Sequence, residues 1–332
     1  MKRGLLLINL GTPDAPKLSA VRKYLNEFLM DNRVIDLPWP LRCLLVKGII
    51  IPFRTKKSAE AYQSIWVKEG SPLLANSQQL CEQLQKSLGD NYKVVLGMRY
   101  GKPSLASALA QLKECDELLI IPLYPQYSSA ATGSALEEVC RLLAKQELIP
   151  SVKLINQFFQ DSAYVQAQSE LIRLHHPSTN HLLFSYHGIP ERQLSKAGCE
   201  EICVAECPLE KNPSCYKAQC YQTSHLLAQH LNLTKHQYTT SFQSRLGKTP
   251  WIKPYTDEVL IKLAAQGVKN LTITCPSFVT DCLETLEEIG LRAKEQWHHL
   301  GGEQFVLVPA MNSHPLWVKT LKDISLQQPW AR

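Results

Sequence analysis

The chain has 332 residues, of which 45% are hydrophobic and 20% are charged, and its formal net charge is +6. This balance is typical of a folded globular protein with one large or two ordinary domains, and it excludes a disordered chain. The basic residues form no long run, so nucleic acid is not an expected partner. No apolar stretch approaches the roughly 18 residues that a membrane-spanning helix needs. The apolar stretch that follows Lys2 and Arg3 is too short for a signal peptide, so we expect a first strand and a cytoplasmic protein.

Short apolar runs alternate with amphipathic stretches along the chain. Strands are predicted over 4–11, 93–100, 117–125, 181–188, 238–244, 270–278 and 303–310. Helices are predicted over 103–114, 134–146, 221–231 and 256–266. Strands that are apolar on both faces and alternate with helices are typical of parallel sheets covered on both sides, so the predicted class is α/β.

The two halves of the sequence resemble each other. Residues 5–13 match residues 182–190, and residues 118–139 match residues 271–289 in their order of strand, proline loop and helix. This repeat predicts two similar Rossmann-like domains, 1–150 and 151–332, that face each other across a cleft. In such folds a ligand binds beyond the carboxyl ends of the strands. Neither a Gly-x-Gly-x-x-Gly nor a Walker sequence occurs, so nucleotide binding has no support.

The least polar segment, "PWPLRCLLVKGIIIPF" at 38–53, is followed by Arg54, Lys56 and Lys57. It has two interpretations. It is either a core helix and loop, or an exposed lip over 38–57 that touches a membrane or a lipophilic ligand, with its cations at the headgroups.

His187 ends an apolar strand and precedes Gly188 and Pro190. At the carboxyl end of a strand its side chain would lie at the rim of the predicted cleft. An imidazole titrates near neutral pH, so it suits proton transfer or the binding of a borderline cation. The alternative is a structural histidine bonded to a backbone carbonyl.

A second candidate is the acidic segment "TDCLETLEEIG", in which Glu284 and Glu288 share one helical face. The alternative is a capping box, with Asp281 as N-cap and Glu284 at the third helical position. The matching segment of the first half lacks an acid at this position. The carboxylate is therefore specific to the second half.

Two loops carry aromatic, hydroxyl and basic side chains that would suit a flat, acidic ligand. One loop contains Tyr124, Tyr127 and Ser128, and the other contains Arg245 and Trp251. A well-packed loop is the alternative for both.

Seven motifs, in order from residue 8 to residue 289, together resemble the ferrochelatase family: "INLGTPDAP", "FLMDNRVIDLPW", "EGSPL", "LYPQYS", "FSYHGIPER", "SFQSRLGKTPW" and "PSFVTDCLETLEEI". The resemblance implies a two-domain α/β monomer or homodimer with a porphyrin cleft between the halves. The family's invariant histidine falls on His187 and its key glutamate on Glu284, with Glu288 behind it. Cys282 is a departure, because some relatives carry histidine there.

The resemblance also implies a reaction, the insertion of Fe²⁺ into protoporphyrin IX to form protohaem. His187 would either accept a pyrrole proton or bind Fe²⁺ together with Glu284, and the sequence leaves both roles open. Two alternatives to this function remain. One is a non-catalytic haem or iron–sulfur sensor on the same scaffold, and the other is a chelatase for coproporphyrin or a sirohydrochlorin-type ring.

Five of the eleven cysteines fall between Cys199 and Cys220. In a chain without an export signal, clustered thiols are expected to be metal ligands. The resemblance aligns Cys220 with an ordinary family cysteine, which leaves four extra thiols: Cys199, Cys203, Cys207 and Cys215. Some ferrochelatases hold a [2Fe–2S] cluster, which we expect on these four, with Cys220 as a substitute ligand and structural zinc as the alternative.

Overall fold

The computed structural model describes residues 2–199, 208–247 and 249–327. The chain divides into two compact units. The first contains the residues up to Tyr124, Ser128–Gln157 and the described residues from 312 onward, and the second contains Pro125–Tyr127 and Phe158–Met311. The last helix of the chain, α12 (Pro315–Gln327), therefore belongs to the unit that also contains the first strand.

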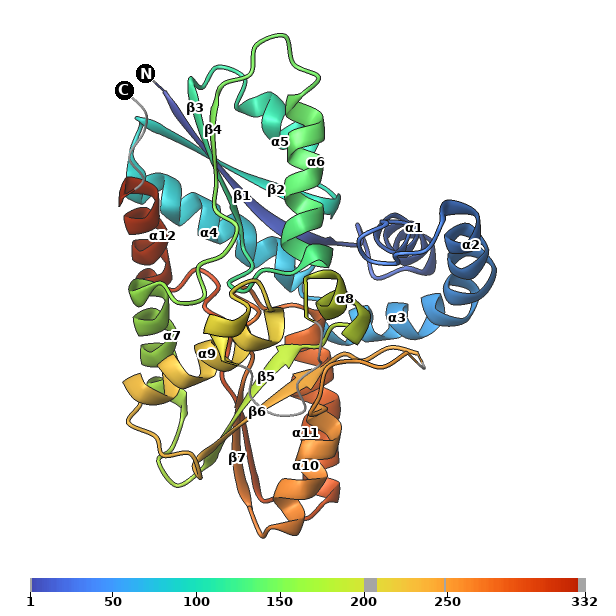
Figure 1. Cartoon of the computed structure of the whole chain (residues 1–332), viewed down its shortest axis with the longest axis vertical. Helices are drawn as coiled ribbons and strands as arrows, with labels where there is room; N and C mark the ends of the chain where they lie inside the picture. The colour runs from blue at the N-terminus through green and yellow to red at the C-terminus, as the bar shows by residue number, and fades with distance from the viewer. Residues whose placement is uncertain (1, 200–207, 248, 328–332) are drawn as a thin grey trace. The chain divides into compact units, whose positions relative to one another are not determined.

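A parallel four-stranded sheet in the order β2-β1-β3-β4 forms the centre of the first unit. Its strands are β1 (Arg3–Thr12), β2 (Tyr92–Gly101), β3 (Glu117–Pro122) and β4 (Ser151–Leu154). Helices α5 (Leu105–Gln111) and α6 (Ser134–Leu143) lie on one face, and α4 (Pro72–Leu88) with α12 lies on the other (Figure 1). The short π-helix η2 (Ser129–Gly133) leads into α6. Because helices cover both faces of the sheet at its central strand β1, the run of leucines in β1 is fully buried.

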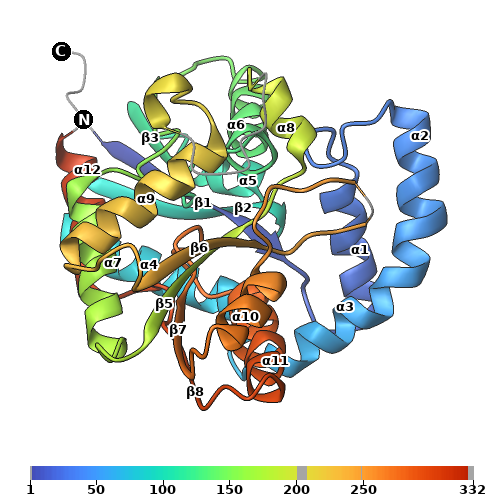
Figure 2. The same cartoon turned by 60° about the horizontal axis from the view of Figure 1, so that its bottom comes forward.

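The second unit repeats this plan with a parallel sheet in the order β6-β5-β7-β8. Its strands are β5 (His181–His187), β6 (Tyr238–Gln243), β7 (Asn270–Thr274) and β8 (Gln304–Leu307). Helices α7 (Ser162–His175) and α9 (Tyr216–His230) cover one face, and α10 (Thr256–Ala265) and α11 (Lys294–His299) cover the other (Figures 1 and 2). The remaining elements are α8 (Glu191–Lys196), the 3₁₀ turn η3 (Leu209–Lys211) and the π-helix η4 (Glu284–Ala293).

The predicted fold class is confirmed, because both sheets are parallel and covered by helices. The segments of the internal sequence repeat also occupy equivalent strands in the two sheets. Its first matched segments contain the central strands β1 and β5, and its second contain their neighbours β3 and β7.

The apolar segment 38–53 is helical and belongs to the first unit, where it follows α1 (Leu18–Leu29). It forms α2 (Trp39–Cys43), the π-helix η1 (Leu44–Ile50) and the start of α3 (Ile51–Ile65). These helices extend away from the sheet of this unit (Figure 2), and Trp39, Leu44 and Phe53 are 64%, 68% and 82% exposed. The segment is therefore not a core helix. Within the described part of the chain, no helix combines the length and the apolar character needed to cross a membrane.

Candidate functional site

The candidate site lies at the carboxyl ends of two paired strands in the second unit. His187 ends β5 and Gln243 ends β6, and these two residues are register partners in the parallel ladder. Ligands of open α/β sheets bind at such strand ends. The fold thus places His187 at the carboxyl end of a strand, as the sequence predicted.

The imidazole of His187 is half-buried and held in one orientation. Its Nδ1 lies 2.5 Å from the carbonyl oxygen of Gly188. Because a carbonyl oxygen only accepts, we assign the proton to Nδ1, which leaves the lone pair of Nε2 available. The rings of Trp251 and Phe278 lie at 6.3 Å and 6.2 Å from the imidazole, centroid to centroid. This contact with a backbone carbonyl is the one expected of a structural histidine, and it leaves Nε2 outside that bond.

Gly188 permits the close approach of the two strand ends. Its N–H donates to the carbonyl oxygen of Gln243 at 2.8 Å, and a Cβ atom on Gly188 would lie 2.8 Å from that same oxygen. Any larger residue would push β5 away from β6 at the site. The Gly-x-Pro that follows His187 is therefore part of the geometry of the site.

Glu284 is connected to His187 through the side chain of Gln243. This amide is 3% exposed, and its Nε2 donates to the backbone carbonyl of Glu284 at 2.9 Å. Its Oε1 accepts a hydrogen bond from Ser185 Oγ at 2.7 Å, two residues before His187. One buried side chain thus ties the end of β5 to the first residue of η4.

The capping-box interpretation of Glu284 is wrong. Leu283, the residue before η4, already has helical backbone angles, so the helix begins there and Glu284 is its second residue and not its third. The carboxylate of Asp281 instead accepts hydrogen bonds from Thr285 Oγ1 at 3.0 Å and from the N–H of Ala310 at 3.2 Å. Glu284 is therefore not placed as the third helical residue that a capping box requires.

Glu288 lies one turn further along η4 and is fixed by Ser244, the residue after β6. Its two carboxylate oxygens accept hydrogen bonds from the N–H of Ser244 at 2.8 Å and from Ser244 Oγ. Ser244 has a φ of +67°, which is costly for a residue with a side chain. Such strain is retained where the surrounding structure requires it, often at functional sites.

Two thiols lie beside these acids. Burial raises the pKa of the Cys282 thiol well above its ordinary value, and the neighbouring Glu284 carboxylate raises it further. Burial likewise raises the pKa of Cys275, whose Sγ lies 3.6 Å from Gln243 Oε1. Both thiols are therefore protonated at neutral pH. The neutral thiol of Cys282 thus lies beside the carboxylate of Glu284.

The sequence missed Gln243 and Ser244, although both lie within the motif "SFQSRLGKTPW". The available signal was their position at the end of a predicted strand. Side chains that act by holding other residues have no distinctive chemistry of their own, so residue type did not mark them.

Of the two aromatic and basic loops, the structure brings Trp251 beside His187. The indole Nε1 of Trp251 donates to the carbonyl of Leu246 at 2.9 Å. The guanidinium of Arg245 lies 4.2 Å from the centroid of the Tyr255 ring and pairs with Asp257 and Glu258. The charge of Arg245 is thus already largely balanced within its own loop.

The other three residues occupy the loop after β3. Tyr124 and Ser128 belong to the first unit and Tyr127 to the second. Ser128 is the N-cap of η2, with its Oγ accepting from the N–H of Ala131 at 3.2 Å. The N–H of Tyr127 donates to Gln219 Oε1 at 2.7 Å. Burial raises the pKa of Tyr124, whose hydroxyl has no hydrogen-bond partner among the residues that the structure describes.

The cysteine segment is described only at its two ends. Cys203 and Cys207 lie outside the described residues. Cys199 is half-buried after α8, and Cys215 is buried at the N-cap of α9. Cys220 is fully buried, and this burial raises its pKa well above the ordinary value. Outside 200–207, 248 and the chain ends, no group of three or more potential metal-ligating side chains is found.

Comparison with known proteins first defines the class. The chain resembles SirB from Bacillus subtilis with Fe³⁺, with a TM-score of 0.56 and 10% identity over 98% of this chain and 95% of that one. It also resembles the sirohydrochlorin chelatase SirB from Bacillus subtilis subspecies spizizenii in complex with cobalt, with a TM-score of 0.54, 11% identity and 98% of both chains covered. At such identities the likeness shows the fold alone, and that fold is the two-domain chelatase fold.

Sequence comparison then defines the family. The ferrochelatase family model matches residues 2–328. Ferrochelatase of Legionella pneumophila (strain Paris) is 60% identical over 330 residues, which cover 99% of this chain and 100% of that protein. Ferrochelatase of Coxiella burnetii (strain Dugway 5J108-111) is 50% identical over 333 residues, which cover 98% and 93%. The chain belongs to the ferrochelatase family, lyases of haem biosynthesis that insert iron into a porphyrin, and the resemblance seen in its motifs is confirmed.

Proposed function

We propose that this protein inserts Fe²⁺ into protoporphyrin IX with His187 and Glu284 as its reacting side chains and Glu288 as the acid behind them. The observation that carries this assignment is the buried amide of Gln243, which connects the strand end that bears His187 to the backbone of Glu284. An imidazole and carboxylates at one sheet edge supply the donor types that bind Fe²⁺ and accept protons.

The chemistry of metal insertion explains why these residue types are needed. Fe²⁺ replaces two pyrrole N–H protons, so both protons must leave the ring as the metal enters. The Nε2 of His187 is free to accept a proton, because Nδ1 carries its own toward Gly188 O. The carboxylates of Glu284 and Glu288 follow one another along η4 and offer the next acceptors. The same oxygens can hold Fe²⁺ briefly with water in the remaining positions, as a delivery site requires.

Substitutions separate the two possible roles of His187. We expect His187→Ala and Glu284→Gln each to abolish anaerobic insertion in a folded protein. If the imidazole is the base, His187→Ala retains its affinity for Co²⁺ in the absence of porphyrin. If the imidazole is a ligand, that affinity falls. Full insertion activity in either variant would contradict the assignment.

Protoporphyrin is the proposed substrate, in preference to coproporphyrin. The support is the likeness to the ferrochelatases of Legionella and Coxiella, together with the wording of the motifs "NLGTP" and "DNRVIDLPW". An anaerobic assay that compares Fe²⁺ insertion into both porphyrins tests this choice. Faster turnover of coproporphyrin would overturn it, and no turnover of either would favour the haem or iron–sulfur sensor.

Trp251 has the strongest support as a porphyrin contact, because its ring lies beside His187. Tyr124, Tyr127, Ser128 and Arg245 are proposed as further contacts. Arg245 would reach a propionate only by exchanging its pairs with Asp257 and Glu258. Trp251→Ala should therefore raise the porphyrin KM more than Arg245→Ala.

Cys199, Cys203, Cys207 and Cys215 are the proposed ligands of a [2Fe–2S] cluster. Two observations support this set. Asn212 Nδ2 donates to the carbonyl of Ala197 at 3.3 Å, which holds the segment before Cys215 beside the segment before Cys199. Cys215 lies at the N-cap of α9, whereas burial raises the pKa of the Cys220 thiol well above its ordinary value.

The bound cluster would stabilise the segment, since insertion involves no net electron transfer. Visible absorption of an iron–sulfur centre and two irons per chain are expected in anaerobically purified protein. Cys215→Ser should remove both signals, and Cys220→Ser should leave them unchanged. Zinc in place of iron would instead identify a structural zinc site.

The exposed apolar side chains of α2, η1 and α3, over 38–57, are the proposed contact with the surface of the inner membrane. Trp39, Leu44 and Phe53 are exposed, and Arg54, Lys56 and Lys57 follow directly. Anionic vesicles should bind the wild type in flotation assays and should bind Leu44→Ser/Phe53→Ser less. Unchanged flotation of this variant would favour a cytoplasmic protein, as monomer or homodimer, without membrane contact.

A further inference from the structure

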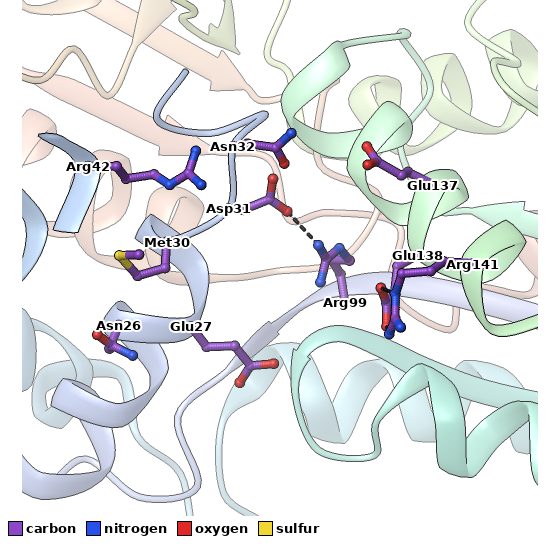
Figure 3. A pocket seen from close by; sticks show the side chains of 10 residues that line it. All are labelled: Asn26, Glu27, Met30, Asp31, Asn32, Arg42, Arg99, Glu137, Glu138 and Arg141. Atoms are coloured by element: carbon purple, nitrogen blue, oxygen red, sulfur yellow. Dashed lines mark hydrogen bonds and ion pairs between the residues drawn. The ribbon is translucent and has the colours of Figure 1, made fainter. Parts of the chain in front are cut away.

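A cavity of about 420 Å³ lies in the first unit, and none of the residues proposed for iron insertion lines it. Its walls come from the end of α1 and the loop after it, from α2, from the end of β2 and from α6. Figure 3 shows that charged side chains converge on it from all of these elements, with Arg42 entering from α2. The way these charges are paired indicates what the cavity can hold.

The acidic side chains in the wall already have partners. Asp31 accepts hydrogen bonds from Arg99 Nη2 at 2.5 Å, Tyr100 Oη at 2.8 Å and Ser134 Oγ at 2.6 Å. Burial alone would raise the pKa of Asp31, but these hydrogen bonds outweigh it, and the pKa lies below its ordinary value. Glu138 is held by Arg141 through two hydrogen bonds, and this contact lowers the pKa of Glu138.

Two further carboxylates in the wall also have bonding partners. Glu137 pairs with Arg33, and Glu27 accepts a hydrogen bond from the N–H of Gly101 at 3.1 Å. The carboxylates therefore leave no strong site for a cation. They satisfy the other arginines of the wall and none of them pairs with Arg42.

Arg42 is the exception among these arginines. The residue is only 9% exposed, and its Nη1 donates to the carbonyls of Ile35 at 3.3 Å and Leu37 at 3.1 Å. Its Nε is buried and has no partner within the described parts of the chain, and no carboxylate described there forms an ion pair with it. Burial of a charge without a counter-ion costs several kcal/mol, and carbonyl dipoles offset only part of this. The charge needs an anion, and the cavity is the space that Arg42 borders.

We infer that this cavity binds a small organic carboxylate, with its anionic group against Arg42. A single negative charge fits this place better than a doubly charged phosphate, because Glu27 and Asp31 stand in the same wall. The amide side chains of Asn26 and Asn32 offer hydrogen bonds to polar groups elsewhere on the ligand. Binding would stabilise the junction of α1 and α2 and hence the base of the exposed apolar segment.

Thermal unfolding of the full-length protein tests this inference. Lactate and succinate are the carboxylate probes, inorganic phosphate is the competing anion, and sodium chloride at equal ionic strength is the reference. We expect a saturable rise in the unfolding midpoint with lactate, a smaller rise with phosphate, and no rise with chloride. Arg42→Gln should lose the rise with lactate. The matched control Arg141→Gln, an arginine of the same wall that is paired with Glu138, should keep it.

A second variant tests the inference even if Arg42→Gln folds poorly. Arg42→Met removes the buried charge but keeps an apolar side chain of similar length. In chloride alone its midpoint should equal or exceed that of the wild type, because an uncompensated charge is gone. The inference is overturned if lactate raises the midpoints of wild type and Arg42 variants equally. It is also overturned if lactate gives neither a midpoint shift nor a calorimetric binding signal with the wild type.

Discussion

Gln243 links the two elements that carry the proposed reacting groups. Its amide accepts from Ser185 on the strand of His187 and donates to the carbonyl of Glu284. Gln243→Leu keeps the volume of the side chain but removes both hydrogen bonds. We expect kcat for iron insertion to fall about 10–100-fold, as for other residues that orient metal ligands, with a nearly unchanged KM for porphyrin. Anaerobic steady-state kinetics over a range of porphyrin concentrations measures this split.

A second buried amide in the same unit serves as the control. Gln168 is 2% exposed, and its Nε2 donates to Thr274 Oγ1 at 3.4 Å, away from both reacting groups. Gln168→Leu should lower the unfolding midpoint by an amount comparable to Gln243→Leu yet keep the wild-type kcat. Equal losses of kcat in both variants would show that Gln243 only fills space.

His176 makes the stability of the protein depend on pH. Both of its ring nitrogens are buried and without a hydrogen-bond partner in the described residues, and burial lowers its pKa. Burial also lowers the pKa of the neighbouring His181, and the charge of His176 lowers it further. Below the unfolded-state pKa of about 6.5 the unfolded chain binds protons that the folded chain does not. The free energy of unfolding should therefore fall as the pH drops below that value and stay level above it.

Urea unfolding between about pH 8 and about pH 5 measures this dependence. His176→Phe should make the profile shallower, because one of the two histidines with a lowered pKa no longer titrates, while His181 still contributes. His236→Gln, at an exposed position, should leave it unchanged. A wild-type profile that rises toward acid pH would show that a group with the opposite shift dominates.

At the scale of single elements, the sequence predicted every strand that the structure describes except β4, including the partly exposed edge strand β8. The run "GLLLINLG" became β1, buried on both faces, and "HLLFSYHG" became β5. Strand β4, with the sequence SVKL, was missed because it is an edge strand of four largely exposed residues and therefore shows no apolar run. An apolar run marks a strand at the centre or at the edge of a sheet, whereas a short polar edge strand gives no such signal.

For the candidate site, the sequence predicted the two proposed reacting residues but not the contact that links their elements. His187 and Glu284 stand out because imidazole and carboxylate carry chemistry at any position. The link between them depends on a long-range hydrogen bond from Gln243 to η4, across 41 residues of sequence. The start of η4 was also misjudged, since the spacing of Asp281 and Glu284 fits a cap that the chain does not form. Sequence spacing reports neighbours along a helix and gives no register between separate elements.

On the scale of the whole molecule, the chain builds its first unit from both of its ends. Helix α12 packs against α4, and its Trp317 and Leu321 are fully buried. Trp297 of α11 is the fully buried tryptophan of the second unit, packed in a cluster with Leu183 and Ile273. The two units therefore offer a matched pair of core tryptophans, one in each sheet's helical layer.

Because each unit has its own core tryptophan, we predict that removing one of them lowers the local stability of its own unit only. Removal of a buried tryptophan costs about 3–5 kcal/mol, because transfer free energy is lost and a cavity remains. We expect Trp317→Ala to increase hydrogen exchange in α4 and β1 while β5 and β7 stay protected, and Trp297→Ala to do the reverse. Exchange measured by mass spectrometry on peptides from each unit decides this. Loss of protection along the entire chain in both variants would mean that the units unfold only together. The C-terminal helix would then stabilise the site of His187 as much as it stabilises β1.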